Sequence, residues 1–295
     1  MEETEIIENS TMFKKLGSIF TDIKLTHTVF ALPFALASAH IAFDGKYDFK
    51  ILALILVCMF TARSAAMAFN RWLDRDIDSV NPRTKSRVIP AGIVKPKEML
   101  FFTIACSIAF VVSSFFLNML AFILSPVALA VILGYSCFKR FTSMSHLVLG
   151  LALAIAPVGA WIAIKGEFGI LPIILAITVI FWVSGFDIIY SCQDTEFDTR
   201  TQLYSFPRRF GVTRALAIST VFHLITIGLL ILFGHLLGYG LIYRGLIALI
   251  AVILLVEHMI VTPDKLGLIG VAFFTLNGFI SIIFYLAVLL DNGRF

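Results

Sequence analysis

Charged residues are scarce in this sequence. Of its 295 residues, 14% are charged and 59% are hydrophobic, whereas a soluble domain has about 25% charged and about 45–50% apolar residues. This composition excludes an ordinary soluble domain, because the excess apolar surface has to face lipid. The net charge of +4 is also small, so the composition gives no support to a nucleic-acid partner.

Cysteines are few, and no cleavable leader is predicted. The cysteines show no spacing typical of a metal site, and we interpret them as small apolar residues; they are Cys58, Cys106, Cys137 and Cys192. The segment 1–20 contains four glutamates and no long apolar core, so it is not predicted to be a signal peptide. Insertion into a membrane would then use the helices of the chain itself.

Long apolar runs are abundant. A membrane-spanning helix needs about 20 mostly apolar residues, and lipid cannot satisfy the backbone of open strands. We therefore expect an all-α integral membrane protein, with nine transmembrane helices in one bundle and one domain over residues 1–295. Two of the helices should form a tight antiparallel hairpin at Asn118. The expected spans are residues 26–43, 51–69, 98–117, 119–137, 146–164, 169–189, 214–235, 239–260 and 268–290.

The distribution of positive charge predicts the orientation in the membrane. Most of the 23 Lys and Arg residues lie in the N-terminal segment or in the loops after the even-numbered spans. Those on the other side are few, namely Lys46, Lys50, Lys165, Arg244 and Arg294. We therefore expect the N-terminal segment, residues 1–24, and the even-numbered loops to be cytoplasmic.

An acidic segment interrupts the apolar pattern at the end of the second expected span. It reads "NRWLDRDIDSVNPRT" over residues 70–84. Asn70, Asp74 and Asp78 recur at every fourth position, which places them on one face of a helix. Asp76 points elsewhere, and we interpret it as a solvated charge.

A second acidic segment, "DIIYSCQDTEFDTR" over residues 187–200, ends the sixth expected span. Its polar residues are three or four positions apart and again share one helix face; they are Asp187, Tyr190, Asp194 and Asp198. Four membrane crossings separate the two segments, so both should lie on the cytoplasmic side, where the active site is expected.

Carboxylates on two facing helix ends repel each other unless a positive charge lies between them. Mg²⁺ prefers oxygen ligands and is usually shared with substrate phosphates, so the two segments predict a Mg²⁺ cofactor. Basic residues near both segments are expected to bind the same phosphates; they are Arg83, Lys85, Arg87, Lys139 and Arg140.

With these residues the chain resembles the UbiA superfamily of intramembrane aromatic prenyltransferases. The family motif N-D-x-x-D-x-x-x-D reads "NRWLDRDID" here, and D-x-x-Y-x-x-x-D-x-x-x-D is matched in full by "DIIYSCQDTEFD". The stretch "RVIPAG" at 87–92 is similar to the family's R-P-L-P-x-G. One position departs from the pattern, because Arg71 stands where the family often has its first Asp.

Three further stretches resemble a bacterial subgroup called 4-hydroxybenzoate polyprenyltransferase-like: "LTHTVFALPFALASA" at 25–39, "YSCQDTEFD" at 190–198 and "LYSFPRRFG" at 203–211. This resemblance implies transfer of a polyprenyl group from polyprenyl diphosphate to an aromatic acid, most simply 4-hydroxybenzoate, for ubiquinone or menaquinone. It also implies a location in the bacterial inner membrane. A dihydroxynaphthoate acceptor in the futalosine route to menaquinone is the alternative within this class.

The resemblance also implies roles for the residues of the two motifs. Asp187 and Tyr190 are expected to orient the aromatic ring or to stabilise the allylic cation. With Arg71 in place of one acid, the first metal would rely on Asn70 and Asp74. The full expected metal set is Asn70, Asp74, Asp78, Asp194 and Asp198.

Arg63 is the most informative single residue. It lies inside the second expected span, two turns before Asn70 and on the same face. An arginine at such a depth costs about 2.5–3.5 kcal/mol on insertion scales and typically faces a polar cavity. We expect it to bind the acceptor's carboxylate or to brace the acidic cluster; a structural pairing with a buried carboxylate is the alternative. His27 and His146 are interpreted as structural or interfacial, and Trp161 and Trp182 as packing or interface residues.

A proton- or ion-coupled transporter is the alternative from another class, because intramembrane charges also mark ion paths. It predicts acids near the middle of the membrane and an internal repeat with broken helices. Here the acids gather at one end of the spans, beside basic loops, so the sequence favours the enzyme.

Overall fold

The computed structural model describes residues 14–23 and 25–291. In that part of the chain the structure is helical, apart from loops and one isolated bridge between Thr262 and Lys265. Eight helical stretches are long and apolar enough to cross a membrane: Phe49–Leu73, Pro96–Leu117, Met119–Phe138, Ser145–Lys165, Ile170–Arg200, Val212–Leu236, Leu241–Ile260 and Val271–Leu290. The protein is therefore a multi-pass membrane protein, as the hydrophobic runs predict.

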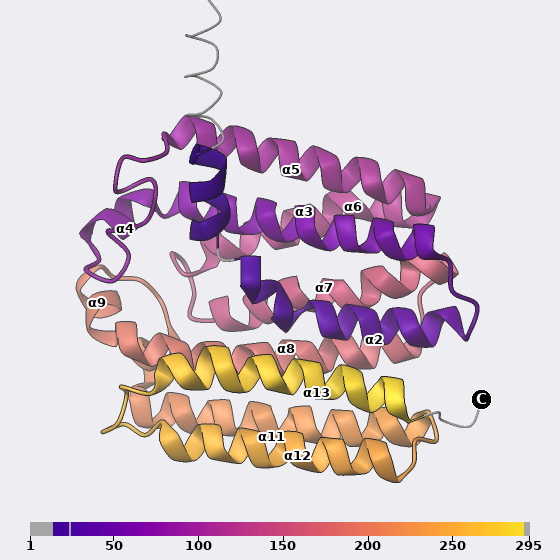
Figure 1. The fold of residues 1–295 in the computed structure, drawn as a ribbon. Helices are drawn as coiled ribbons and strands as arrows, with labels where there is room; N and C mark the ends of the chain where they lie inside the picture. Colours follow the sequence, from indigo (N-terminus) through magenta and orange to yellow (C-terminus); the bar gives the residue numbers. More distant parts are fainter. Residues whose placement is uncertain (1–13, 24, 292–295) are drawn as a thin grey trace, which may run out of the picture.

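These stretches contain the helices α3 (Phe49–Leu73), α5 (Pro96–Leu117), α6 (Met119–Phe138), α7 (Ser145–Lys165), α8 (Ile170–Ser191), α11 (Val212–Leu236), α12 (Leu241–Ile260) and α13 (Asn277–Leu290). They run side by side across the molecule (Figure 1). Short helices α4 (Arg75–Val80) and α9 (Thr195–Arg200) lie together at one end. The two acidic segments are thus at the same end of the bundle, as expected.

The first expected span is shorter than predicted. A 3₁₀ segment, Leu25–Phe30, precedes helix α2, Leu32–Phe43, and the continuous apolar helix is only Thr28–Phe43. Pro33 stands in the first turn of α2. Proline has no N–H and is tolerated in the first turn of an α-helix, where the N–H groups have no partner within the helix, so the regular α-helix begins next to Pro33. The count of nine spans is therefore approximate.

The hairpin at Asn118 is confirmed. Only this residue separates α5 from α6. Its side-chain oxygen accepts a hydrogen bond from the N–H of Ala121, and its amide nitrogen donates to the carbonyls of Ile162 and Ala163 on α7. The cap begins α6 and holds the turn against a third helix.

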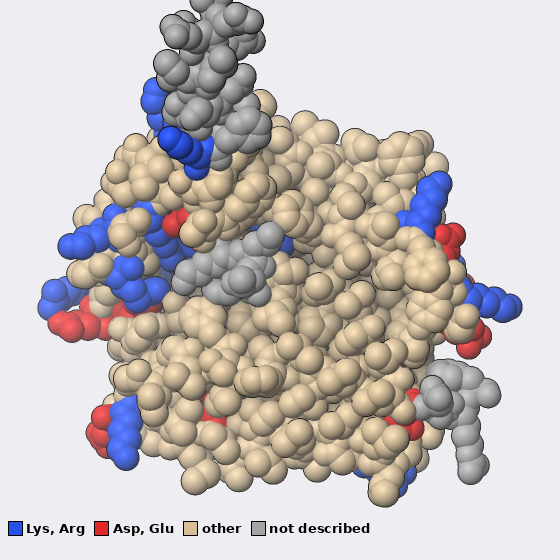
Figure 2. All heavy atoms as spheres, in the orientation of Figure 1, with Lys and Arg blue, Asp and Glu red and all other residues tan. Residues whose placement is uncertain are grey.

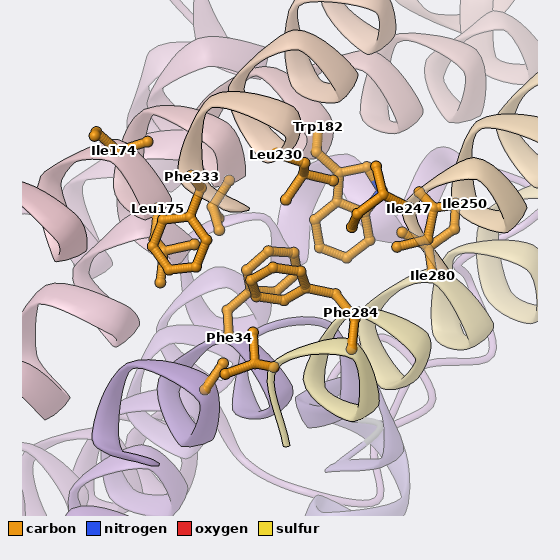
Figure 3. Close-up of a cluster of buried hydrophobic side chains, with 14 of the residues drawn as sticks. Phe34, Ile174, Leu175, Trp182, Leu230, Phe233, Ile247, Ile250, Ile280 and Phe284 are labelled. Atoms are coloured by element: carbon orange, nitrogen blue, oxygen red, sulfur yellow. The ribbon is translucent and has the colours of Figure 1, made fainter. Parts of the chain in front are cut away.

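Charge is distributed as a membrane protein requires. On the face in Figure 2, Lys, Arg, Asp and Glu gather at the two ends, and the surface between them is almost entirely uncharged. Beneath this surface, α2, α8, α11, α12 and α13 enclose a core of large side chains (Figure 3). The ring of Phe34 stacks on that of Phe284 at 4.6 Å and lies 5.1 Å from that of Trp182.

A polar network passes through this apolar core. The indole N–H of Trp182 donates to Asn277 Oδ1 at 2.8 Å, and Asn277 Nδ2 donates to Glu257 Oε1 at 2.9 Å and to the carbonyl of Ala272 at 3.0 Å. The last bond connects the side chain of Asn277 to a π-helical segment, Val271–Leu276, that precedes α13. The sequence did not predict this segment within the last span.

A close approach of two helices gives a test of the fold. A Cβ atom added at Gly234 on α11 would meet Cε1 of Tyr243 on α12 at 2.2 Å, and Tyr243 is buried with its hydroxyl donating to Leu230 O. We expect Gly234→Ala to lower the stability by about 1–3 kcal/mol, because it overpacks this contact. The measurement is the apparent melting temperature of the detergent-purified protein.

Gly228→Ala is the matched control, since it lies on the same helix with nothing within 4 Å of the added Cβ. Alanine is the better helix former by up to about 1 kcal/mol, so this variant should melt at the same or a higher temperature. Equal melting temperatures for the two variants would contradict the tight contact between α11 and α12.

Candidate active site

The first acidic segment continues α3 almost without interruption. Asp74 caps α3, and α4 follows at once, so Asn70, Asp74 and Asp78 keep the common face that their spacing predicts. Asp74 is 1% exposed and Asp78 is 4% exposed. The side chain of Asp76 is 83% exposed, which agrees with its interpretation as a solvated charge.

Asp74 is surrounded by positive charge from another loop. Lys139 Nζ lies 2.5 Å from its Oδ2 and Arg140 lies 3.1 Å from its Oδ1, and the amide nitrogen of Asn70 donates to Oδ2 at 3.0 Å. Arg140 also donates to the carbonyl of Leu73. The loop between α6 and α7 is thereby fastened to the end of α3.

Asp78 has a separate partner. One nitrogen of Arg87 lies 2.7 Å from both oxygens of its carboxylate. Arg87 belongs to the "RVIPAG" stretch, so this contact folds the loop after α4 back onto the first acidic segment.

Arg83 joins the first segment to the second. Its Nε and NH2 groups donate to the two oxygens of Asp194 at 3.1 Å and 2.6 Å, and its NH1 group donates to the hydroxyl of Tyr190 at 2.9 Å. Burial alone would lower the pKa of Arg83, but the hydrogen bond with Asp194 and the neighbouring acids hold that pKa above its ordinary value. Arg83 therefore remains a cation between the two segments.

A cavity of about 700 Å³ lies between the two segments. Nearly all the residues that the sequence singled out line it: Arg63, Asn70, Asp74, Asp78, Arg83, Arg87, Lys139, Asp187, Tyr190, Asp194 and Asp198. Two do not. Lys85 is exposed on the loop outside, and Arg140 binds the end of α3 from beyond the cavity.

Arg63 lines this polar cavity and also a second, largely apolar cavity of about 380 Å³ between α3, α5, α6 and α7. Within the described chain its buried Nε atom has no hydrogen-bond partner, and no carboxylate forms an ion pair with it. Within these residues, Arg63 therefore does not form the structural ion pair that was the alternative role for it.

Arg71 has a function in the fold that sequence reasoning missed. It is 4% exposed, and its guanidinium donates to Asp22 Oδ2 at 2.9 Å, to the Asp22 carbonyl and to Asn70 Oδ1. Asp22 belongs to the helix over residues 14–22 and lines the cavity. An arginine at an acid's place in the motif was the available signal, since an unpaired buried guanidinium is costly and a carboxylate elsewhere in the chain can offset that cost.

This arrangement also engages Asn70. Its oxygen, the atom that would ligate a metal, accepts the hydrogen bond from Arg71, and its nitrogen donates to Asp74 and Ser136. Asn70 is therefore placed beside the cavity as predicted but is already hydrogen-bonded on both sides.

His146 is a second residue whose place was not foreseen. Its Nδ1 atom lies 2.7 Å from Asp187 Oδ2, and it lines the cavity, whereas the sequence suggested a structural or interfacial residue. The side chain of His27 lies outside the described residues.

Asp74, Asp78 and Asp194 are each paired with Lys or Arg, whereas Asp198 forms no ion pair within the described residues. Among residues 14–23 and 25–291, no three His, Cys, Asp or Glu side chains are grouped closely enough to hold a metal by themselves. Mg²⁺ is commonly held by one or two carboxylates together with substrate phosphates. The donor chemistry of the cavity fits such shared binding, because Asp74 and Asp78 line one side and Asp194 and Asp198 the other.

A charged cavity lies at one end of the membrane-spanning bundle, next to an apolar cavity, and such an arrangement is typical of a binding site for an amphiphilic ligand. Residues 31–285 match the family model described as the UbiA prenyltransferase family, so the chain belongs to this family and is a prenyltransferase of the UbiA type. The resemblance inferred from the two motifs is confirmed.

Named relatives differ in their substrates. A 4-hydroxybenzoate octaprenyltransferase from Paraburkholderia phytofirmans is 30% identical over 69% of this chain and 70% of its own length. A protoheme IX farnesyltransferase from Archaeoglobus fulgidus is 32% identical over 68% and 72%.

Solved structures share the fold. A UbiA homologue from Aeropyrum pernix K1 is 31% identical with a TM-score of 0.82, covering 90% of this chain and 98% of that one. A homologue from Archaeoglobus fulgidus, solved with DMAPP and Mg²⁺, is 21% identical with a TM-score of 0.74 over 92% and 98%. Mg²⁺ is thus found in this family, as the sequence predicts.

The buried pair of Arg71 and Asp22 gives the second test. Removing one partner of a buried ion pair typically costs about 3–5 kcal/mol, so Arg71→Gln should strongly lower the melting temperature. Arg75→Gln is the control, because its pairing with Asp76 is at the surface and such pairs contribute about 0–1 kcal/mol. In the Asp22→Asn/Arg71→Gln double variant the effects should fall short of additivity by about 0.5–3 kcal/mol. Strict additivity would show that the two side chains do not interact.

Proposed function

We propose that this protein transfers a polyprenyl group from polyprenyl diphosphate to an aromatic carboxylate, with 4-hydroxybenzoate as the leading acceptor, in respiratory quinone biosynthesis. The observation that carries the proposal is the position of Arg63, a buried guanidinium that lines both a charged cavity and an apolar one. The relatives named 4-hydroxybenzoate octaprenyltransferase support this acceptor.

The diphosphate is assigned to the charged cavity. Arg83, Arg87 and Lys139 line it, and each now binds an acid that it can exchange for phosphate oxygens. Hydrogen bonds from such cations to phosphate are among the strongest in proteins. They would stabilise the negative charge that develops on the leaving diphosphate as the allylic C–O bond breaks.

Asp74, Asp78, Asp194 and Asp198 are assigned to Mg²⁺, and Asn70 to a supporting position through its hydrogen bonds to Asp74 and Arg71. The bound ion supplies charge neutralisation and Lewis-acid activation of the diphosphate. Lys85 and Arg140 are assigned no direct contact with the phosphates, because neither lines the cavity.

The apolar cavity is assigned to the polyprenyl chain. Small and aliphatic side chains from α3, α5, α6 and α7 surround it, with Arg63 at its polar boundary. Burial of prenyl carbon is favourable by about 0.8 kcal/mol per CH₂ group, which would hold the tail with C1 directed toward the charged cavity.

The acceptor is assigned to the space beside Arg63, Asp187 and Tyr190. Arg63 offers a bidentate match for a carboxylate, and Tyr190 is held by Arg83. A dihydroxynaphthoate also carries a carboxylate, so it is the alternative acceptor. The transporter alternative gains no support, because the chain belongs to a prenyltransferase family and the acids lie at one end of the spans.

We also assign the protein to the bacterial inner membrane with the N-terminal segment in the cytoplasm. The basic loops support this orientation, because loops rich in Lys and Arg are typically cytoplasmic and Lys139, Arg83 and Arg87 line the same cavity as the acids. The diphosphate would then enter from the cytoplasmic side.

The metal is tested by chelation and substitution. We expect EDTA to abolish prenyl transfer and added Mg²⁺ to restore it. Asp74→Asn and Asp198→Asn should each lower kcat/KM by roughly 100-fold or more, because each removes charge that organises the diphosphate. Asp76→Asn is the control and should be nearly silent, since that side chain is solvated. Full activity in EDTA would refute the metal assignment.

Arg63 is tested by the kinetics of the two substrates. Arg63→Ala should weaken use of the aromatic acid by on the order of 30-fold or more, because loss of a buried charge partner costs about 2–5 kcal/mol. Arg63→Lys keeps the charge but loses the fork, so its KM for the acid should also rise. The KM for polyprenyl diphosphate should change little in both variants.

An acceptor without the carboxylate is the control substrate, and it should lose much less from the same changes. A rise in the KM for the diphosphate instead would assign Arg63 to the phosphates. Transfer to neither 4-hydroxybenzoate nor a dihydroxynaphthoate would refute the proposed function.

A further inference from the structure

His146 is the second residue of α7 and faces α8 across the edge of the cavity. It is 3% exposed, and its Nδ1 atom lies 2.7 Å from Oδ2 of Asp187. Asp187 is 21% exposed and lines the cavity. A buried imidazole thus holds a carboxylate that is open to the cavity.

The other ring nitrogen fixes the tautomer. The backbone N–H of Phe206 donates to Nε2 of His146 at 3.3 Å. Phe206 is the first residue of helix α10, Phe206–Phe210, where the N–H has no partner within the helix. A ring nitrogen that accepts a hydrogen bond carries no proton, so the proton of the neutral imidazole is on Nδ1 and is donated to Asp187.

The imidazole is also fixed in place. The ring of Phe206 packs edge-on against the imidazole, with 5.3 Å between the two centroids, and the backbone of His146 lies against α8, where Ser184 Oγ is 3.1 Å from its carbonyl oxygen. These contacts orient the Nδ1–H bond and leave the ring little freedom to rotate.

Asp187 keeps one oxygen for another partner. Its Oδ2 atom is occupied by His146, while Oδ1 has no hydrogen-bond partner in the part of the chain that the structure describes. We propose that His146 is a positioning residue, which holds Asp187 as an oriented carboxylate with Oδ1 directed at the aromatic acceptor. This proposal rests on the proposed function and assigns one step of it to these two residues.

The step is the loss of the ring proton. The allylic C–O bond breaks with its electron pair leaving on the diphosphate, and a π electron pair of the acceptor forms the new C–C bond. The substituted ring carbon then releases its proton to Asp187 Oδ1, and the C–H electron pair restores the aromatic ring. His146 does not take the proton, because Nε2 is engaged by Phe206 and Nδ1 already carries a proton.

Replacing His146 by asparagine or by glutamine distinguishes a positioning role of this residue from a purely structural role. Asparagine can place its NH₂ group near the position of Nδ1, so His146→Asn keeps a donor to Asp187 and loses the acceptor for Phe206. Glutamine reaches the position of Nε2, so His146→Gln keeps an acceptor for Phe206 and loses the bond to Asp187. Each of the two variants therefore keeps one of the two hydrogen bonds of His146 and loses the other.

We expect His146→Gln to lower kcat by on the order of 100-fold, within the range that acid–base groups contribute, and His146→Asn to stay within about 10-fold of the wild type. The KM for polyprenyl diphosphate should change little in either variant. With an acceptor deuterated at the substituted ring position, the isotope effect on kcat should rise in His146→Gln. His223→Asn removes a buried imidazole that does not line the cavity and controls for loss of a buried histidine.

The opposite ranking, with His146→Gln active and His146→Asn impaired, would overturn the proposal and assign His146 to the start of α10. Wild-type kinetics in both variants would overturn it too.

A readout independent of turnover is the ¹⁵N NMR spectrum of ring-labelled histidine in the detergent-purified protein. We expect His146 to show a protonated Nδ1 and an unprotonated Nε2, with the Nδ1 signal shifted in Asp187→Asn. The reverse tautomer would overturn the proposal even if the enzyme is active. If no acceptor is prenylated but the expected tautomer is found, the proposed function fails and the pair of His146 and Asp187 stands.

Discussion

Asp74, Asp78 and Asp194 are largely removed from water and matched by positive partners, and the arrangement of this site depends on these pairs. An unpaired buried charge costs several kcal/mol even after the protein relaxes. Asp74 therefore draws in Lys139 and Arg140, and Asp194 draws in Arg83. Each cation comes from a different loop than its acid, so charge pairing brings the ends of α3, α6 and α8 together around one cavity. Under the proposed function, a diphosphate and its Mg²⁺ would take the place of these ion pairs. The cations would then bind phosphate oxygens and the carboxylates would bind the metal.

The replacement of the motif's acid by Arg71 follows the same constraint. A cation inside this cluster would be costly alone, but Asp22 supplies the missing negative charge from the helix over residues 14–22. Arg71 and Asp22 neutralise each other, so the pair adds no net charge to the cluster, whereas an aspartate at position 71 would add one negative charge. The pair also makes that helix part of the cavity wall, so a change of one residue in the motif is coupled to the position of a segment about 50 residues away.

The sequence predicts the features that depend on local spacing, such as spans and helix faces. It does not predict contacts between residues that are far apart in the chain. Hydrophobic length predicts the spans, and intervals of four residues place Asp74 with Asp78 and Tyr190 with Asp194. The loop residues Arg83, Lys85 and Arg87 were grouped together, yet only Arg83 and Arg87 line the cavity, because a loop has no period from which direction can be inferred. The pairing of His146 with Asp187 joins residues 41 positions apart, and nothing in the local pattern of either segment points to the other. The break before α2 was readable from Pro33 and was missed.

A chain of side-chain contacts connects the apolar core to the charged cavity. The side chain of Asn277 forms hydrogen bonds with Trp182 and Glu257 in the core and with the carbonyl of Ala272 in the π-helical segment. Such π-helical turns are frequent at functional sites. The next residue of that segment, Phe273, lines the cavity and lies 4.2 Å from the ring of Tyr190, measured between centroids. Tyr190 in turn receives the hydrogen bond from Arg83 that links the two acidic segments. The polar network inside the membrane thus contacts the same short segment that carries Phe273, and Phe273 packs against the tyrosine to which Arg83 is hydrogen-bonded.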